Sequence, residues 1–463
     1  MHDGAAMAQP LGMDSPQRPV PRPVMAFLVL GIAAGTCFAL WTPPHDAPDE
    51  PRHLQRVWLL SEGSIALPGP GPGEGGAVPE SLYALHSRYQ RGTVSCRHDP
   101  QEILAALQTP LAPERRRDHI RTPILYGPAG YLFPALVVAP ARGLGASAGG
   151  LFYLARLANL AAWGALCGLA IAIAPARRWV LVAVALLPMS LFEASTISAD
   201  AATNALALVL LAWTLRLSVP SDGLVAARER YGYVALVALL GLAKPGYSLL
   251  ALLALGVPAV RLGGPRRRWG FVALATLAGL VFPLGWGLAL QLAGPFPFPR
   301  ADPSGQLAGI PREPVRFVSA VGLTLIDRAA DFARSAVGVM GRLDVRLPPV
   351  AYAAYGVLLL VASVAEDREA PRLPGVTRAV LASVALLGVL AIPALLYVSA
   401  TPLGAGRVIG IQGRYFLPFL PLVLAALPVV FDGGGTRRWG ILCASGTGLA
   451  LAMAAIWQRY YGL

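Results

Sequence analysis

The sequence predicts an all-α polytopic membrane protein with about 11 transmembrane helices and two large external loops that carry interfacial helices. Two observations support this class. First, 55% of the 463 residues are hydrophobic and only 14% are charged, with a mean hydropathy of +0.57, whereas soluble domains have about 25% charged residues. Second, the basic residues lie in short clusters between apolar runs. This positive-inside pattern is typical of polytopic membrane proteins, and it argues against a nucleic-acid partner.

The first transmembrane helix is predicted to run from about residue 24 to Trp41. Residues 1–23 contain five prolines and no apolar period, so we expect a disordered N-terminus. Arg18 and Arg22 precede the apolar run, and no convincing cleavage site follows it. The sequence therefore predicts a retained first helix with its N-terminus in the cytoplasm.

Ten further apolar runs have about the length needed to cross ~30 Å of hydrocarbon. They are residues 150–174, 178–195, 200–217, 231–244, 247–262, 269–291, 348–364, 376–399, 414–431 and 438–457. Another run, 124–141, contains three prolines and is ambiguous. If it does not cross, the arginine clusters between the spans face the cytoplasm, whereas a full crossing turns the central clusters outward. We therefore predict that 124–141 is interfacial or re-entrant.

This topology gives four segments: the N-terminus over 1–23, a transmembrane module over 24–292 that includes external loop 42–149, a second external loop over 293–347, and C-terminal helices over 348–463. The second loop contains a mainly apolar helical stretch from Val315 to Met340, which we expect to lie along the membrane surface. Of the four cysteines, only Cys96 lies in a loop, so a structural disulfide is not expected.

Two adjacent carboxylates follow the first helix, in the stretch Pro48-Asp49-Glu50-Pro51-Arg52-His53. The prolines restrict Asp49 and Glu50, so both are presented at a fixed place at the membrane surface. A carboxylate there can accept a proton from an attacking hydroxyl or hold a divalent cation, and His53 is near enough to orient it or to bind phosphate. The alternative is a helix N-cap.

Two more charged residues lie at the predicted outer ends of spans. Asp200 is close to an outer helix N-terminus, where capping is the alternative role. Lys244, the single lysine of the chain, precedes Pro245. One lysine at a helix break suggests a phosphate or carboxylate partner, although snorkelling toward the interface explains it almost equally well.

The turn over residues 410–415 carries Gln412 and Arg414 and enters a span from outside. Its glycines let the backbone approach a ligand, and arginine makes the forked contact that suits phosphate. The alternative is an arginine that anchors a helix end. The topology, which was derived without these motifs, places all the charged candidates on the same face. They are Asp49, Glu50, Asp200, Lys244 and Arg414.

Several motifs together resemble the predicted membrane proteins of domain-of-unknown-function family 2142, over about residues 24–431. They are Pro48–His53, Tyr126-Gly-Pro128, Leu154-Ala-Arg156-Leu-Ala-Asn159, Pro188-Met-Ser, Ser198-Ala-Asp200, Lys244-Pro-x-Tyr247, Gln306-Leu, Gly341 with Asp344, and Gly410-x-Gln-Gly-Arg-Tyr415. That family resembles the GT-C superfamily of integral-membrane glycosyltransferases.

The resemblance implies a GT-C-like helix bundle, an acidic motif in the first external loop and a polyprenyl-phosphate sugar donor. By this resemblance Asp49 would be the catalytic base, with Glu50 beside it, and Asp200 the second acidic position. Lys244 and Arg414 would hold the donor phosphate. His53, Tyr126 and Gln412 complete the expected substrate-binding residues.

The function expected from these features is transfer of a sugar from a polyprenyl-phosphate donor to an envelope glycan, lipid or protein. The site would face the extracytoplasmic side of a bacterial inner membrane. No Gly-x-Gly-x-x-Gly motif follows a predicted strand, which favours a lipid-carried donor over a nucleotide sugar. No cofactor is certain, and a divalent cation stays open. The alternatives are a transporter or flippase of lipid-linked sugars, and a non-catalytic partner in an envelope polysaccharide assembly complex.

Overall fold

The computed structural model describes residues 22–65, 76–89, 99–118, 126–221, 223–293 and 301–462. Within this part, six helices are long and apolar enough to cross a membrane. They are α1 (Arg22–Trp41), α6 (Ala148–Ile173), α9 (Ala199–Ser218), α11 (Pro265–Ala293), α16 (Gly375–Ser399) and α18 (Gly435–Tyr460). The disorder predicted for 1–23 falls almost wholly on residues outside the described part, as does Cys96. The other three cysteines are free thiols.

The remaining five predicted spans are shorter or interrupted, so the described residues contain six candidate spans and not eleven. Pro188 and Pro245 each begin a new helix after a break, because proline lacks an N–H and disfavours helical backbone in the preceding residue. The resulting pieces are α7 (Arg178–Ala185), α8 (Pro188–Ala194), α10 (Ala227–Ala243), the 3₁₀ helices η3 (Pro245–Gly256) and η4 (Ala259–Leu262), α15 (Pro349–Val364), the 3₁₀ helix η5 (Gly413–Phe416) and α17 (Leu420–Ala426).

Helix α9 is the centre of the bundle. In its most apolar window 83% of the residues are buried, against 33–50% in the other five candidate spans. It packs against α6, α8, α10 and η3. A helix that is apolar on all sides belongs in an interior, and this position brings the N-terminal turn of α9 to the meeting point of several other segments.

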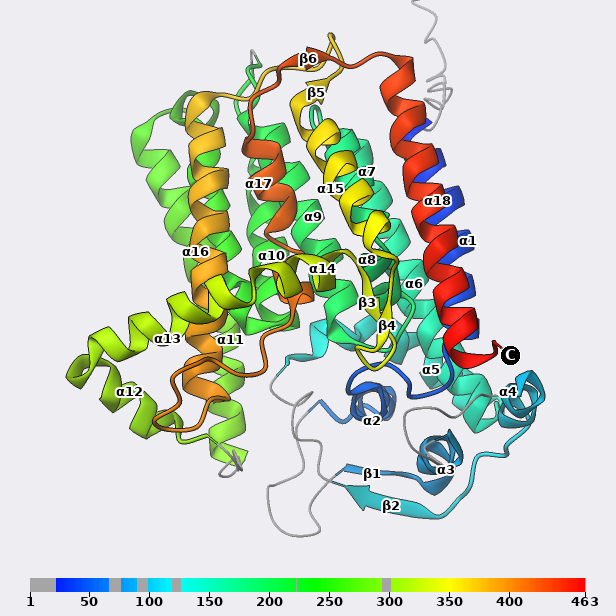
Figure 1. Cartoon of the computed structure of the whole chain (residues 1–463). Helices are drawn as coiled ribbons and strands as arrows, with labels where there is room; N and C mark the ends of the chain where they lie inside the picture. The colour runs from blue at the N-terminus through cyan, green and yellow to red at the C-terminus, as the bar shows by residue number, and fades with distance from the viewer. Residues whose placement is uncertain are drawn as a thin grey trace, which may run out of the picture.

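Short elements cover one end of the bundle, drawn lowest in Figure 1 and here called the loop end. They are α2 (Glu50–Ser61), β1 (Gly76–Pro79), α3 (Glu80–Tyr89), α4 (Pro100–Leu107), β2 (Arg115–Asp118), η2 (Pro128–Tyr131) and α5 (Leu132–Gly143). Strands β1 and β2 pair antiparallel. Leu54 and Trp58 of α2 share a small hydrophobic core with Tyr131, Val138 and Phe152, and this core fixes α2 against the bundle.

The ambiguous run 124–141 forms η2 and α5, apart from residues 124 and 125, which lie outside the described part. Helix α5 has 12 residues, about 18 Å at 1.5 Å per residue, which is shorter than the hydrocarbon core. It packs against α2 and α6. Its length agrees with the expectation that this run does not cross the membrane.

The second predicted loop also folds at the loop end, as α12 (Pro303–Arg312), α13 (Pro314–Asp327), α14 (Ala329–Gly338) and the antiparallel pair β3 (Val339–Met340) and β4 (Val345–Arg346). The stretch predicted from Val315 to Met340 is therefore two helices that separate at Arg328. Helix α13 buries Ala320 and Thr324 and exposes Val318 and Ile326, so one of its apolar faces is free.

The opposite end of the bundle gathers arginines from separate connections. The two-residue strands β5 (Ala365–Glu366) and β6 (Phe431–Asp432) pair parallel there, at the top of Figure 1. Arg177 donates to the carbonyl oxygens of Ser363 and Leu427. Arg368 and Arg437 pair with Asp432 and Asp367, each at 2.8 Å. The basic clusters thus meet at the end that lies away from the loop elements.

Candidate functional site

A charged cluster lined by tyrosines lies where the loop end meets the bundle. It contains a lysine, an arginine and two acids from four separate segments. Its members are Glu193 in α8, Asp200 in the first turn of α9, Lys244 after α10, Arg414 in η5, and the tyrosines Tyr126, Tyr247 and Tyr415.

Lys244 and Asp200 form a nearly buried ion pair. Lys244 ends α10 with extended backbone because Pro245 follows it. Its ammonium group lies 5.1, 5.6 and 4.9 Å from the ring centroids of Tyr126, Tyr247 and Tyr415, within the range of cation–π attraction. Lys244 is therefore held by a carboxylate and three aromatic faces.

Arg414 and Glu193 form a looser pair. Arg414 Nε is 3.6 Å from Glu193 Oε1, with 9% and 1% of the side chains exposed. Glu193 Oε2 accepts a 2.7 Å hydrogen bond from Asn204. Among the described residues, neither Nε nor Oε1 has a hydrogen-bond partner, so this pair still has bonding capacity for a polar ligand.

Helix α2 brings His53 to the cluster. His53 Nδ1 and the Tyr131 hydroxyl are hydrogen-bonded at 2.7 Å, and the imidazole stacks on Tyr126 at 6.4 Å with an interplanar angle of 9°. Burial lowers the pKa of His53 to about 4, although the negative charges of Asp200 and Asp49 oppose that shift. The imidazole is therefore neutral near pH 7. Burial also raises the pKa of Tyr126.

Asp49 lies directly before α2 and is open to solvent. Its backbone is left-handed, with φ 59°, and its side chain makes no capping hydrogen bond, so it does not play the N-cap role considered above. The carboxylate is 46% exposed and lies 3.4 Å from Arg52. Left-handed backbone is uncommon for residues other than glycine, and here it separates Asp49 from its buried neighbour Glu50.

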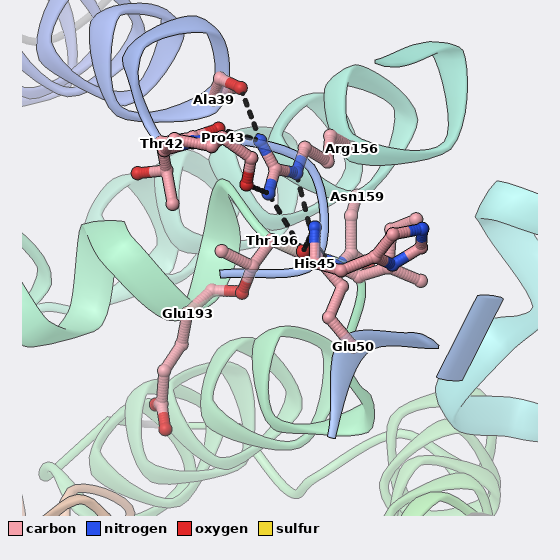
Figure 2. A network of polar contacts seen from close by, with 10 residues as sticks. Ala39, Thr42, Pro43, His45, Glu50, Arg156, Asn159, Glu193 and Thr196 are labelled. Atoms are coloured by element: carbon pink, nitrogen blue, oxygen red, sulfur yellow. Dashed lines mark hydrogen bonds and ion pairs between the residues drawn. The ribbon is translucent and has the colours of Figure 1, made fainter. Parts of the chain in front are cut away.

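Glu50 lies in a fully buried ion pair with Arg156 of α6 (Figure 2). All five N–H groups of Arg156 are used. They donate to Glu50 Oε1 and Oε2 at 2.8 and 2.7 Å and to the carbonyl oxygens of Ala39, Thr42 and Pro43 at 2.7, 2.6 and 3.1 Å. The pair therefore ties the end of α1 and the start of α2 to α6.

The carboxylate of Glu50 is equally saturated. Oε1 also accepts from the Ile197 N–H at 3.0 Å, and Oε2 from the His45 N–H at 3.1 Å. Each oxygen thus accepts two hydrogen bonds, which fills its lone pairs. In this structure Glu50 is not placed to accept a proton from a substrate; it positions Asp49 on one side and the turn before α9 on the other.

Gln412 and Gly413 lie against α14. The Gly413 N–H donates to Ser335 Oγ at 2.9 Å, and a Cβ on Gly413 would overlap with the carbonyl oxygen of Phe332. Gln412 Oε1 is buried without a hydrogen-bond partner among the described residues. The glycines of this turn were expected to let the backbone approach a ligand. At Gly413 the backbone instead lies close to helix α14.

Three other residues of the sequence motifs, Asn159, Gln306 and Asp344, make contacts that support the fold. Asn159 donates to the carbonyl oxygens of Thr196 and Ser198, Gln306 to that of Thr401, and Arg459 pairs with Asp344 at 2.8 Å.

Sequence reasoning missed Arg56. His53 and Arg56 are three residues apart in α2, so they lie on the same side of that helix, and this spacing was the available signal. Arg56 is fully buried in the structure.

In the described part of the chain, no group of three or more His, Cys, Asp or Glu side chains is placed to hold a metal ion. Asp200 faces Lys244 instead, so its charge is already balanced by a side chain.

Six long apolar helices, with a charged cluster buried at one end of their bundle, define a multi-pass membrane protein. The chain belongs to the family described as predicted membrane protein (DUF2142), which matches residues 32–423. No curated protein and no solved structure gives a significant match.

Proposed function

We propose that the protein is a membrane glycosyltransferase. It transfers a sugar from a polyprenyl-phosphate donor to an envelope glycan, lipid or protein on the extracytoplasmic side of a bacterial inner membrane. The observation that carries this proposal is the convergence of Lys244, Arg414 and Asp200 beside His53 on α2, the helix that Asp49 precedes. These residues combine cations for a phosphate with an open carboxylate for a hydroxyl.

The orientation follows from charge. Arginines from the connections at Arg177, Arg368 and Arg437 meet at the end opposite the cluster. Because clustered arginines in short connections stay in the cytoplasm, the loop end faces outward. Nucleotide sugars are absent on that side, so a donor carried by a lipid fits the location.

The proposed reaction is a direct displacement. The carboxylate of Asp49 takes the proton of the acceptor hydroxyl, whose oxygen bonds to the anomeric carbon as the bond from that carbon to the donor phosphate breaks. Polyprenyl phosphate leaves, and the anomeric configuration inverts. Lys244 and Arg414 stabilise the charge on the departing phosphate, while the flat faces of His53 and Tyr126 support the sugar.

The test is transfer of a labelled sugar from a panel of polyprenyl-phosphate donors by the full chain in proteoliposomes. Asp49→Asn is expected to reduce transfer by about 100-fold or more. The matched control is Asp327→Asn. It removes an exposed carboxylate of α13 that forms a 2.7 Å ion pair with Arg407, and we expect it to have little effect on transfer.

Undiminished transfer by Asp49→Asn would remove the assigned base. If the wild-type protein moves lipid-linked sugars across the bilayer and transfers none to any acceptor, a transporter is the better description.

A further inference from the structure

Arg56 is a buried charge that forms no ion pair with any residue that the structure describes. Its side chain is 0% exposed, and Nη2 donates a hydrogen bond to the carbonyl oxygen of Ile65 at 3.5 Å. Within the described part of the chain, Nε and Nη1 have no acceptor, and no carboxylate forms an ion pair with this guanidinium. Burial lowers the pKa of Arg56 to about 10, so the group is still cationic at neutral pH.

Two nearby arginines show how this fold satisfies a guanidinium that has a structural role. Arg156, also 0% exposed, donates five hydrogen bonds and pairs with Glu50. Arg142 stacks over Trp58 at 5.1 Å and pairs with Glu62 at 3.1 Å. Unlike both of these arginines, Arg56 pairs with no carboxylate among the described residues; its contacts are the Ile65 carbonyl oxygen and the ring of Trp286. A buried charge without an opposite charge destabilises a protein, so the unused N–H groups of Arg56 are available to bind an anion.

The groups around Arg56 indicate what kind of anion it could bind. Arg56 is close enough to Tyr131 for their charges to interact, and Tyr131 is hydrogen-bonded to His53, which stacks on Tyr126 beside Lys244. On its other side, Arg56 lies 5.5 Å from the ring centroid of Trp286 in α11. Leu284 and Leu288, which flank Trp286, are 67% and 56% exposed, so α11 presents apolar side chains outward at this level.

We propose that Arg56 binds the phosphate group of the lipid-linked donor at the junction of α2 and α11, as a third cation of the site beside Lys244 and Arg414. An arginine fork matches the geometry of phosphate oxygens. The position between the charged cluster and the outward apolar face of α11 lets the lipid chain lie along α11 while its phosphate enters beside Arg56. This inference rests on the proposed function for the identity of the ligand, and its chemistry is that of a phosphate monoester or diester.

The experiment measures binding to the full chain in detergent with three probes: farnesyl phosphate, farnesol and inorganic phosphate. The variants are Arg56→Gln, Arg56→Lys and the control Arg142→Gln. Arg56→Gln is expected to weaken farnesyl phosphate binding by about 10- to 100-fold, which corresponds to the loss of charge-assisted hydrogen bonds. Arg56→Lys is expected to retain part of the affinity, and Arg142→Gln to retain all of it.

Thermal unfolding without ligand separates a binding role from a structural one. Arg56→Gln is expected to unfold at the same temperature as the wild type or above it, because an uncompensated charge has been removed. Arg156→Gln is expected to unfold at a clearly lower temperature, since it leaves Glu50 buried and unpaired. A loss of stability in Arg56→Gln as large as that in Arg156→Gln would overturn the proposal.

The probes also distinguish the possible sources of the phosphate. Binding of farnesyl phosphate that depends on Arg56, with weaker binding of inorganic phosphate and of farnesol, supports a lipid phosphate. Equal binding of inorganic phosphate and farnesyl phosphate would overturn the lipid assignment, and unchanged farnesyl phosphate affinity in Arg56→Gln would overturn the whole inference. None of these readouts requires sugar transfer. If the wild-type protein binds farnesyl phosphate through Arg56 but transfers no sugar, that result would refute the proposed function and leave the inference about Arg56 intact.

Discussion

Asp49 and Glu50 are neighbours in sequence with opposite environments. The left-handed backbone at Asp49 leaves its carboxylate 46% exposed, while Glu50 is 0% exposed and saturated with hydrogen bonds. The motif predicted that both acids are presented at a fixed place at the membrane surface, with Glu50 beside the expected base Asp49. The structure gives them different environments: the Asp49 carboxylate is open to solvent and free to exchange a proton, whereas the Glu50 carboxylate is buried and fully bonded.

His53 makes the stability of the protein depend on pH. Its pKa is about 4 in the folded chain and about 6.5 when unfolded. Below pH 6.5 the unfolded chain binds a proton that the folded chain does not take up, so stability is complete above pH 6.5 and falls as the pH drops toward 4. The loss contributed by this group is at most about 3 kcal/mol.

The measurement is the unfolding temperature in detergent from pH 7.5 to 4.5, for the wild type and for His53→Gln. The variant is expected to lose less stability than the wild type over this interval. Parallel curves for the two proteins would show that His53 is not buried as a neutral group.

At the scale of elements, broken helices deliver the charged cluster. Proline ends α10 so that Lys244 turns inward, and the short helix η5 carries Arg414 to the same place. The sequence marked these breaks through Pro245 and the glycines of the turn 410–415. It did not show that the turn packs against α14, because that contact joins segments about 80 residues apart.

Gly413→Ala tests this packing. The added Cβ overlaps with the carbonyl oxygen of Phe332 and with Ser335, and backbone cannot move aside as a flexible side chain can. We expect a destabilisation of about 1–3 kcal/mol, together with reduced activity because Arg414 is displaced.

Gly406→Ala is the matched control, since a Cβ at Gly406 meets nothing within 4 Å. The measurement is the free energy of unfolding, or the unfolding temperature, of each variant, and only Gly413→Ala is expected to be destabilised. Equal stability of the two would mean that η5 does not pack tightly on α14.

At the scale of the whole molecule, charge separates the two ends of the bundle. The loop end carries the candidate site, and the opposite end carries the arginine clusters. Hydrophobicity predicted the helical class correctly, but the predicted count of eleven spans is not shown, since the other five apolar runs form helices shorter than a candidate span or, as at Pro188, helices interrupted by proline. Among the described residues, six helices are long and apolar enough to cross a membrane.

The orientation is testable with single cysteines in a background that lacks the native ones. Ser64 at the loop end and Glu369 at the opposite end are both exposed. In intact cells, a reagent that does not cross the inner membrane is expected to label a cysteine at Ser64→Cys but not one at Glu369→Cys, which should react only after permeabilisation. The reverse pattern would place the candidate site in the cytoplasm and would remove the case for a lipid-carried donor.

The sequence by itself determined the membrane class, the charge asymmetry between the loops and the residue types of the site, because hydropathy, arginine placement and proline breaks are local properties of the chain. Only the tertiary structure decided which charges meet. It paired Glu50 with Arg156, Lys244 with Asp200 and Arg414 with Glu193, and it buried Arg56 with no carboxylate partner among the residues it describes. Such pairings depend on packing between segments tens to more than 200 residues apart, and no local pattern encodes that.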